Sequence, residues 1–177
     1  FCRHCDDSVD RVASQEENLF TLAGLRRELE QTCQGHASEP VFMALADVSE
    51  RYDIPQEYFQ EVVSGVECDL VKNRYQDFEQ LRQYCYQVAS VVGLICLQIF
   101  GYKDPVAKQH AIDLGLAMQL TNIARDVRED LELDRIYLPQ DEMARFGYSE
   151  AELQAGVVNE AFAELMRFQT QRAKLYF

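Results

Sequence analysis

Four aspartates in this sequence form two pairs with the same spacing. Asp6 and Asp10 are four residues apart in "DDSVD", and Asp126 and Asp130 are four apart in "QLTNIARDVRED". In a helix this spacing places each pair on one face, where like charges repel by roughly 0.2–0.5 kcal/mol. If the pairs face each other, cations must lie between them. Mg²⁺ suits such a site because it binds hard oxygen ligands and takes further oxygens from substrate phosphates.

The sequence around the second pair favours a binding site over a solvated surface. Acidic residues four apart are common on exposed helix faces, where they serve no site. Asp126 and Asp130 instead follow the apolar stretch "AIDLGLAMQL", and Gln119 and Asn122 continue the same polar stripe. Arg125 adjoins the stripe and is a candidate phosphate ligand.

Composition limits the classes of partner. Asp and Glu number 30 against 17 Lys and Arg, a net charge of −13 that argues against a nucleic-acid surface. A polyanion could still bind if a metal supplied the positive charge.

The six cysteines stand mostly among helix-forming residues, and no secretory leader precedes them, so we expect a reduced, cytoplasmic protein. The spacing Cys2-x-x-Cys5 with Cys33-x-x-His36 is a weak imitation of a zinc site.

The chain reads as helices separated by short breakers. Apolar positions at helical spacing and capping signals predict an all-α fold, a bundle around a helix at 84–101 that is buried on every side. The stretch "VASVVGLICLQIFGY" falls short of the length that a bilayer requires. The helices are expected at residues 1–13, 16–34, 40–52, 55–72, 77–101, 105–132 and 158–177, with Asp77 as a cap and a capping box at Ser149 and Glu152.

Three stretches of the chain resemble the signatures of the squalene/phytoene synthase family. They are "FCRHCDDSVD", "YCYQVASVVG" and "LGLAMQLTNIARDVREDLELDRIYLP", in that order, and the linking "GVECDLVKNRYQDFEQL" and terminal "ELMRFQTQRAKLYF" are also similar. The resemblance implies the helical terpenoid-synthase fold around a central apolar cavity. We expect one domain at 1–177 that lacks the family's N- and C-terminal helices.

The same resemblance implies a prenyltransferase that joins two allylic diphosphates 1′ to 1 through a cyclopropyl intermediate. Asp6, Asp10, Asn122, Asp126 and Asp130 match the two aspartate-rich motifs, which would hold two or three Mg²⁺ ions. Tyr84 matches the active-site tyrosine. The remaining matches contact substrate phosphates or cover the pocket entrance: Arg3, Gln119, Arg125, Arg135 and Tyr137.

The resemblance leaves the substrate open. Farnesyl diphosphate would give presqualene diphosphate, squalene or dehydrosqualene, and overall likeness slightly favours these thirty-carbon products. Geranylgeranyl diphosphate would give phytoene. NADPH enters only if the product is squalene. We expect no nucleic-acid partner, and peripheral association with the inner face of the membrane would serve product release; the oligomeric state stays open.

Three other functions are consistent with parts of the sequence. A diphosphate hydrolase would ionise the same substrate and let water quench the cation. A di-iron bundle protein would need Glu-x-x-His pairs, and none of the three histidines follows a glutamate by three residues. A non-catalytic helical partner would be expected to lose the aspartate pairs, which this sequence keeps.

Overall fold

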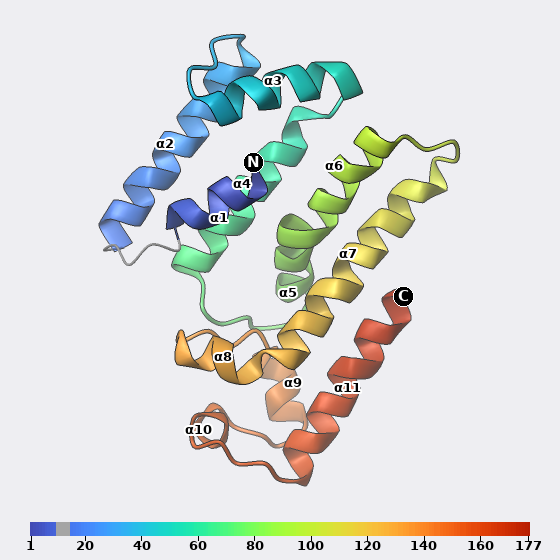
Figure 1. The fold of residues 1–177 in the computed structure, drawn as a ribbon. Coiled ribbons are helices and arrows are strands. Elements are labelled where there is room, and N and C mark those ends of the chain that lie inside the picture. Colours follow the sequence, from blue (N-terminus) through green and yellow to red (C-terminus); the bar gives the residue numbers. More distant parts are fainter. Residues whose placement is uncertain (10–14) are drawn as a thin grey trace.

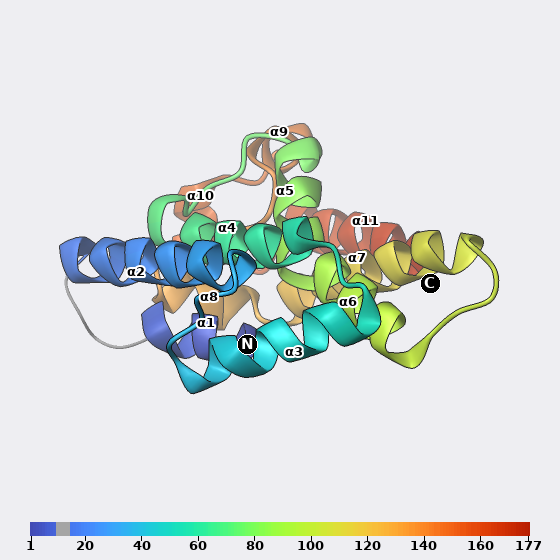
Figure 2. The same cartoon turned by 90° about the horizontal axis from the view of Figure 1, so that it is seen from above.

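The computed structural model describes the backbone of residues 1–9 and 15–177, and their side chains except those of Asp6, Ser8, Val9 and Gln15. Figures 1 and 2 show it from two sides. Within this part the helices are α1 (Cys2–Val9), α2 (Gln15–Cys33), α3 (Pro40–Tyr52), α4 (Gln56–Val71), α5 (Phe78–Cys85), the π-helical turn η1 (Tyr86–Ser90), α6 (Val91–Phe100), α7 (Val106–Arg125), α8 (Val127–Glu132), α9 (Gln140–Arg145), α10 (Glu150–Gln154) and α11 (Glu160–Tyr176).

Local capping explains where several helices begin. The Asp77 side chain accepts a hydrogen bond from the backbone N–H of Gln80 at 2.9 Å, which satisfies a donor that the first turn of α5 leaves open. Ser149 and Glu152 form the expected capping box at α10. Pro40 occupies the first turn of α3, where its missing N–H costs nothing. These predicted helix starts are confirmed.

The helices pack one after another across the molecule. α1, α2 and α3 lie on one side, α4 packs between them and η1 and α6, and α7 packs between α6 and α11 (Figures 1 and 2). No strand occurs in the described residues, where the one backbone bridge joins Arg74 to Ile136. The predicted all-α class is confirmed.

The prediction that the central helix is buried on every side is wrong. α5, η1 and α6 form one continuous helical segment, Phe78–Phe100, which by length and composition alone could cross a membrane. It packs instead against α4 and α7. Within the stretch 88–102 only Ser90, Val91 and Leu94 are buried, and Phe100 is 83% exposed. Helices cover this segment on two sides, so much of its apolar surface is half-buried.

The helix expected at 105–132 is broken. α7 ends at Arg125, and Asp126 leaves helical geometry with φ −100° and ψ 18° before α8 begins at Val127. Both flanking hydrogen bonds survive: Asp126 donates to the Asn122 carbonyl and Asp130 to the Asp126 carbonyl, each at 2.8 Å. The one-turn spacing of the two aspartates therefore persists across the break. No proline or glycine in "QLTNIARDVRED" announces it.

Two loops that are distant in sequence, 72–77 after α4 and 133–139 after α8, are joined by hydrogen bonds. The Ile136 N–H donates to the Asn73 carbonyl at 2.9 Å, and the Gln140 N–H donates to the Tyr75 carbonyl at 2.9 Å. The Arg74 guanidinium binds the Glu150 carboxylate and both the carbonyl and the carboxylate of Asp134. These contacts fix the segment 133–139, which carries Arg135 and Tyr137, against the end of α4.

Candidate active site

One ridge of α7 changes from apolar to polar along its length. Leu114, Met118, Asn122 and Asp126 follow one another at intervals of four residues, so their side chains are neighbours on the helix surface. Leu114 is 50% and Met118 55% exposed, although both are large and apolar. Other faces of α7 bury Leu116, Leu120 and Ile123 against neighbouring elements. The ridge thus offers apolar surface that continues directly into oxygen ligands.

The two aspartates of the second motif differ in environment. The Asp126 carboxylate accepts two hydrogen bonds from the Arg125 guanidinium, at 2.5 and 2.6 Å, which holds its pKa below the ordinary value. Burial, Asp126 and Asp69 together raise the pKa of Asp130 to about 6, and Arg135 only partly opposes them. Negative charge is therefore concentrated around Asp130, where a bound cation would relieve it.

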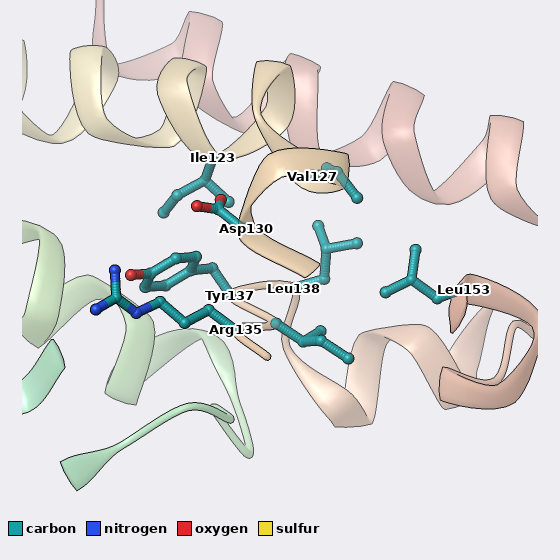
Figure 3. Close-up of a pocket in the computed structure, with 8 residues that line it drawn as sticks. Ile123, Val127, Asp130, Arg135, Tyr137, Leu138 and Leu153 are labelled. Atoms are coloured by element: carbon teal, nitrogen blue, oxygen red, sulfur yellow. The ribbon is translucent and has the colours of Figure 1, made fainter. Parts of the chain in front are cut away.

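Asp130 lies beside the two residues expected from the "DRIYLP" segment. Figure 3 shows its carboxylate near the ring of Tyr137, with the Arg135 guanidinium and the Tyr137 hydroxyl extending to the same side. These three side chains line a small cavity of about 10 Å³ together with Ile123 and apolar neighbours. That volume is near the minimum for one water molecule, so the cavity is no substrate pocket. It shows that the fold brings Asp130, Arg135 and Tyr137 together.

A chain of hydroxyls connects Tyr84 to an aspartate that the sequence analysis did not select. The Tyr84 hydroxyl donates to the Tyr137 oxygen at 3.2 Å, and the Tyr137 hydroxyl donates to Asp69 Oδ1 at 2.9 Å. The two rings are stacked with centroids 5.1 Å apart, and the Tyr75 ring packs against both. Arg135 also donates to the Asp69 carbonyl at 3.3 Å. The signal for Asp69 was its place in the stretch "GVECDLVKNRYQDFEQL" that resembles the family, where Glu67 is a second acidic residue.

The first motif is only partly visible. Asp6 is on α1, but its side chain lies outside the described part of the structure, and Asp10 lies outside the described residues altogether. Arg3 is exposed and pairs with Asp7 at 2.9 Å. α1 packs against α2 and α4. The structure therefore leaves the expected convergence of the two motifs as a prediction.

The donor set of the second motif suits a hard cation. The described side chains include no group of three His, Cys, Asp or Glu residues close enough to hold a metal by themselves. Asn122, Asp126 and Asp130 nevertheless present amide and carboxylate oxygens at one-turn intervals, with excess negative charge at Asp130. This set fits Mg²⁺ if the first motif and substrate phosphates complete the coordination. None of the six cysteines, all of which lie in the described residues, forms a disulfide bond, and the expected reduced state stays a prediction.

Comparison with known proteins adds independent evidence. The model of the squalene/phytoene synthase family matches residues 1–177. The chain is 42% identical to a phytoene synthase of Arthrospira platensis and 39% identical to a 15-cis-phytoene synthase of Synechococcus elongatus; each match covers 100% of this chain, and 62% and 61% of the relatives. The chain thus spans about three fifths of the length of these relatives.

Solved structures show the same fold. A squalene synthase from Alicyclobacillus acidocaldarius superposes with a TM-score of 0.92 at 28% identity, over 99% of this chain and 66% of the other. A dehydrosqualene synthase, solved in complex with a ligand, gives a TM-score of 0.87 at 32% identity, over 99% and 61%. Family model, relatives and fold agree, so the chain belongs to the squalene/phytoene synthase family.

Proposed function

We propose that the whole protein condenses two molecules of geranylgeranyl diphosphate head to head to phytoene. The observation that carries the proposal is the α7 ridge, on which exposed Leu114 and Met118 run directly into Asn122 and Asp126. A prenyl diphosphate has the same order of parts, an apolar chain followed by a charged head group. The ridge therefore matches the substrate class of the family from chain to diphosphate.

The choice of the twenty-carbon substrate draws on the relatives. Two cyanobacterial proteins named phytoene synthase are 42% and 39% identical to this chain, whereas the squalene and dehydrosqualene synthases of known structure are 28% and 32% identical. This comparison supports phytoene better than the thirty-carbon products that overall likeness slightly favoured. Farnesyl diphosphate stays the second candidate, because the solved structures with TM-scores of 0.92 and 0.87 are named squalene synthase and dehydrosqualene synthase.

The proposed reaction balances without a reductant. In the first step one diphosphate leaves, one double bond and one C–H bond supply the electrons for the two carbon–carbon bonds that close the cyclopropane ring, and one proton is lost. In the second step the other diphosphate leaves, the ring rearranges to the 1′–1 linkage, and a second proton is lost to give the hydrocarbon. A squalene product would instead require a hydride, and therefore NADPH. Mg²⁺ held by Asn122, Asp126, Asp130 and the first motif would neutralise the departing diphosphate.

Residues of this chain supply the other requirements. Arg125 and Arg135 place positive charge beside Asp126 and Asp130, where a diphosphate would bind. Leu114 and Met118 exclude water along the prenyl chain, which protects the cation from quenching. The stacked rings of Tyr84 and Tyr137 would stabilise a cation bound next to them. The cytoplasmic location and peripheral contact with the membrane stay predictions.

The test is product analysis. The whole protein is incubated with Mg²⁺ and with each diphosphate separately, and the extracted products are identified by mass spectrometry. We expect phytoene from geranylgeranyl diphosphate at a higher kcat/KM than any product from farnesyl diphosphate. A preference for farnesyl diphosphate would support the second candidate, a prenyl alcohol would indicate a hydrolase, and no product from either would refute catalysis.

A variant pair links this activity to the ridge. Asp126→Asn should lower turnover by about 10²-fold or more, because it removes a charged ligand of the Mg²⁺ that would stabilise the departing diphosphate. Helix content should stay the same. Glu132→Gln is the matched control, since this exposed carboxylate has only a 3.7 Å contact with Arg128. Normal turnover in Asp126→Asn would show that the stripe does not hold the metal.

A further inference from the structure

The hydroxyl chain from Tyr84 to Asp69 has a direction that the aspartate sets. An ionised carboxylate can only accept hydrogen bonds. The single hydroxyl hydrogen of Tyr137 is therefore committed to Asp69 Oδ1, at 2.9 Å. The Tyr137 oxygen can then only accept from Tyr84, whose hydroxyl hydrogen points to it at 3.2 Å. Consequently the Tyr84 hydroxyl has no hydrogen left to donate elsewhere, and toward any further partner its oxygen can act only as an acceptor.

The surroundings hold this chain rigidly. Tyr84 is 5% and Tyr137 7% exposed, so water has little access to compete for their hydroxyls. Each of the three members comes from a different element: Asp69 from the last turn of α4, Tyr84 from α5, and Tyr137 from the segment that backbone hydrogen bonds tie to the loop after α4. A shift of any one element would lengthen a hydrogen bond. Asp69 thus fixes both the position and the polarity of the hydroxyl pair.

We propose that Asp69 is a positioning residue for the condensation, which acts through Tyr137 to present the Tyr84 oxygen to the prenyl cation as an acceptor. The inference depends on the proposed function, in which Tyr84 stabilises a nearby prenyl cation. A hydroxyl that turns its hydrogen toward a cation repels it, whereas one that turns its lone pairs toward it stabilises it. A neutral residue at position 69 loses this control, because Tyr137 can then reverse its hydrogen bond.

Tyr75 provides an internal control for the proposal. Its ring packs against Tyr84 and Tyr137, but its buried hydroxyl has no hydrogen-bond partner in the described part of the structure. Tyr75→Phe removes one hydroxyl oxygen from the same cluster as Tyr137→Phe does, without touching the chain. Tyr137→Phe breaks the directed hydrogen-bond chain, whereas Tyr75→Phe changes only the packing of the cluster, so comparing them separates the two effects.

The experiment compares Asp69→Asn, Asp69→Glu, Tyr137→Phe and Tyr75→Phe in the whole protein. We expect Asp69→Asn and Tyr137→Phe each to lower kcat by about 10- to 100-fold with KM nearly unchanged. Losses of this size are typical for groups that orient a functional side chain without touching the substrate or metal. The double variant should be no slower than the slower single one, because both remove the same effect. Asp69→Glu should keep more of the wild-type kcat than Asp69→Asn, and Tyr75→Phe should keep all of it.

A spectroscopic readout separates this inference from the proposed function. Ultraviolet resonance Raman reports through the tyrosine doublet whether a phenol donates or accepts, and the difference between wild type and Tyr84→Phe isolates Tyr84. We expect a donor signature in wild type that is lost in the Asp69→Asn background. An unchanged signature would overturn the positioning role. A wild-type protein without turnover would refute the proposed function and leave the Raman test decisive.

Two kinetic results would also overturn it. Losses of kcat that multiply in the Asp69→Asn, Tyr137→Phe double variant would show that the residues act independently. A higher Mg²⁺ requirement for Asp69→Asn, with kcat restored at saturating Mg²⁺, would place Asp69 among the metal ligands instead.

Discussion

At Gly115 the backbone of α7 lies directly against the backbone of η1, and Gly115→Ala should destabilise the fold. A Cβ built on Gly115 would lie 2.4 Å from Ser90 Cα, 2.6 Å from Ser90 N and 2.9 Å from the Ala89 carbonyl carbon. Ordinary contact begins near 3.4 Å, so the backbones must separate by 3.4 − 2.4 = 1.0 Å. All three atoms belong to the backbone, and no side chain can rotate out of the way.

The magnitude follows from three contributions. Overpacking of this kind costs about 1–3 kcal/mol. Separation of the helices also weakens the 2.8 Å hydrogen bond from Ser90 Oγ to the Ile112 carbonyl, worth about 1 kcal/mol. Alanine regains about 1 kcal/mol of helix propensity over glycine. The free energy of unfolding should therefore fall by about 2 kcal/mol. Turnover should fall about 10-fold or more, since the shift displaces Asn122 relative to Tyr84.

Denaturant unfolding with Gly24→Ala as control measures this directly. Gly24 is also helical, but nothing lies within 4 Å of a Cβ built on it, so the same substitution should raise the free energy of unfolding by roughly 0.5–1 kcal/mol. Opposite signs at the two glycines are the expected result. A Gly115→Ala variant as stable as wild type would refute the close contact between η1 and α7.

Two further perturbations test the site and its support. Because folding raises the pKa of Asp130 from 3.8 to about 6, the ionised carboxylate destabilises the metal-free fold above that range. Asp130→Asn should therefore raise the free energy of unfolding by about 1 kcal/mol near pH 7.5 in EDTA, a value discounted for partial exposure of the carboxylate. Thermal melts should show that this gain in stability shrinks as the pH falls from about 6 to 4. A gain that grows toward acid would contradict this shift. Arg74→Met should lower the free energy of unfolding by about 2 kcal/mol and speed hydrogen exchange at 133–139, because the guanidinium joins Asp134 to Glu150. Arg128→Met is the control and should change neither quantity, since Arg128 makes only an exposed 3.7 Å ion pair. Unaltered exchange in Arg74→Met would show that Arg74 does not hold the 133–139 segment in place.

Helix positions were largely predictable from sequence because they depend on local signals. Asp77, Pro40 and the Ser149–Glu152 box mark helix starts by their own chemistry, and the structure confirms each of them. The break at Asp126 has no such mark. Its φ and ψ depart from helical values while both flanking hydrogen bonds remain, so periodicity continues through it.

Tertiary contacts were harder to predict. The carboxylates around Asp130 and the importance of Asp69 emerge only when the ends of α4 and α8 meet, which depends on hydrogen bonds between residues more than 60 positions apart. Apolar content likewise predicts burial for the whole 84–101 segment, but burial depends on how many elements surround a helix. Spacing identified which residues lie on one helix face; it carried no information on which faces meet.

The most direct test of the central claim is binding of a geranylgeranyl thiolodiphosphate, an analogue that resists ionisation, to the whole protein by calorimetry. If one ridge of α7 binds both parts of the substrate, affinity should require Mg²⁺ and should fall by about 10-fold or more in Met118→Glu, which places a charge against the prenyl chain. Inorganic diphosphate should bind both proteins equally. Analogue binding that is indifferent to Mg²⁺ and to Met118→Glu would contradict the claim.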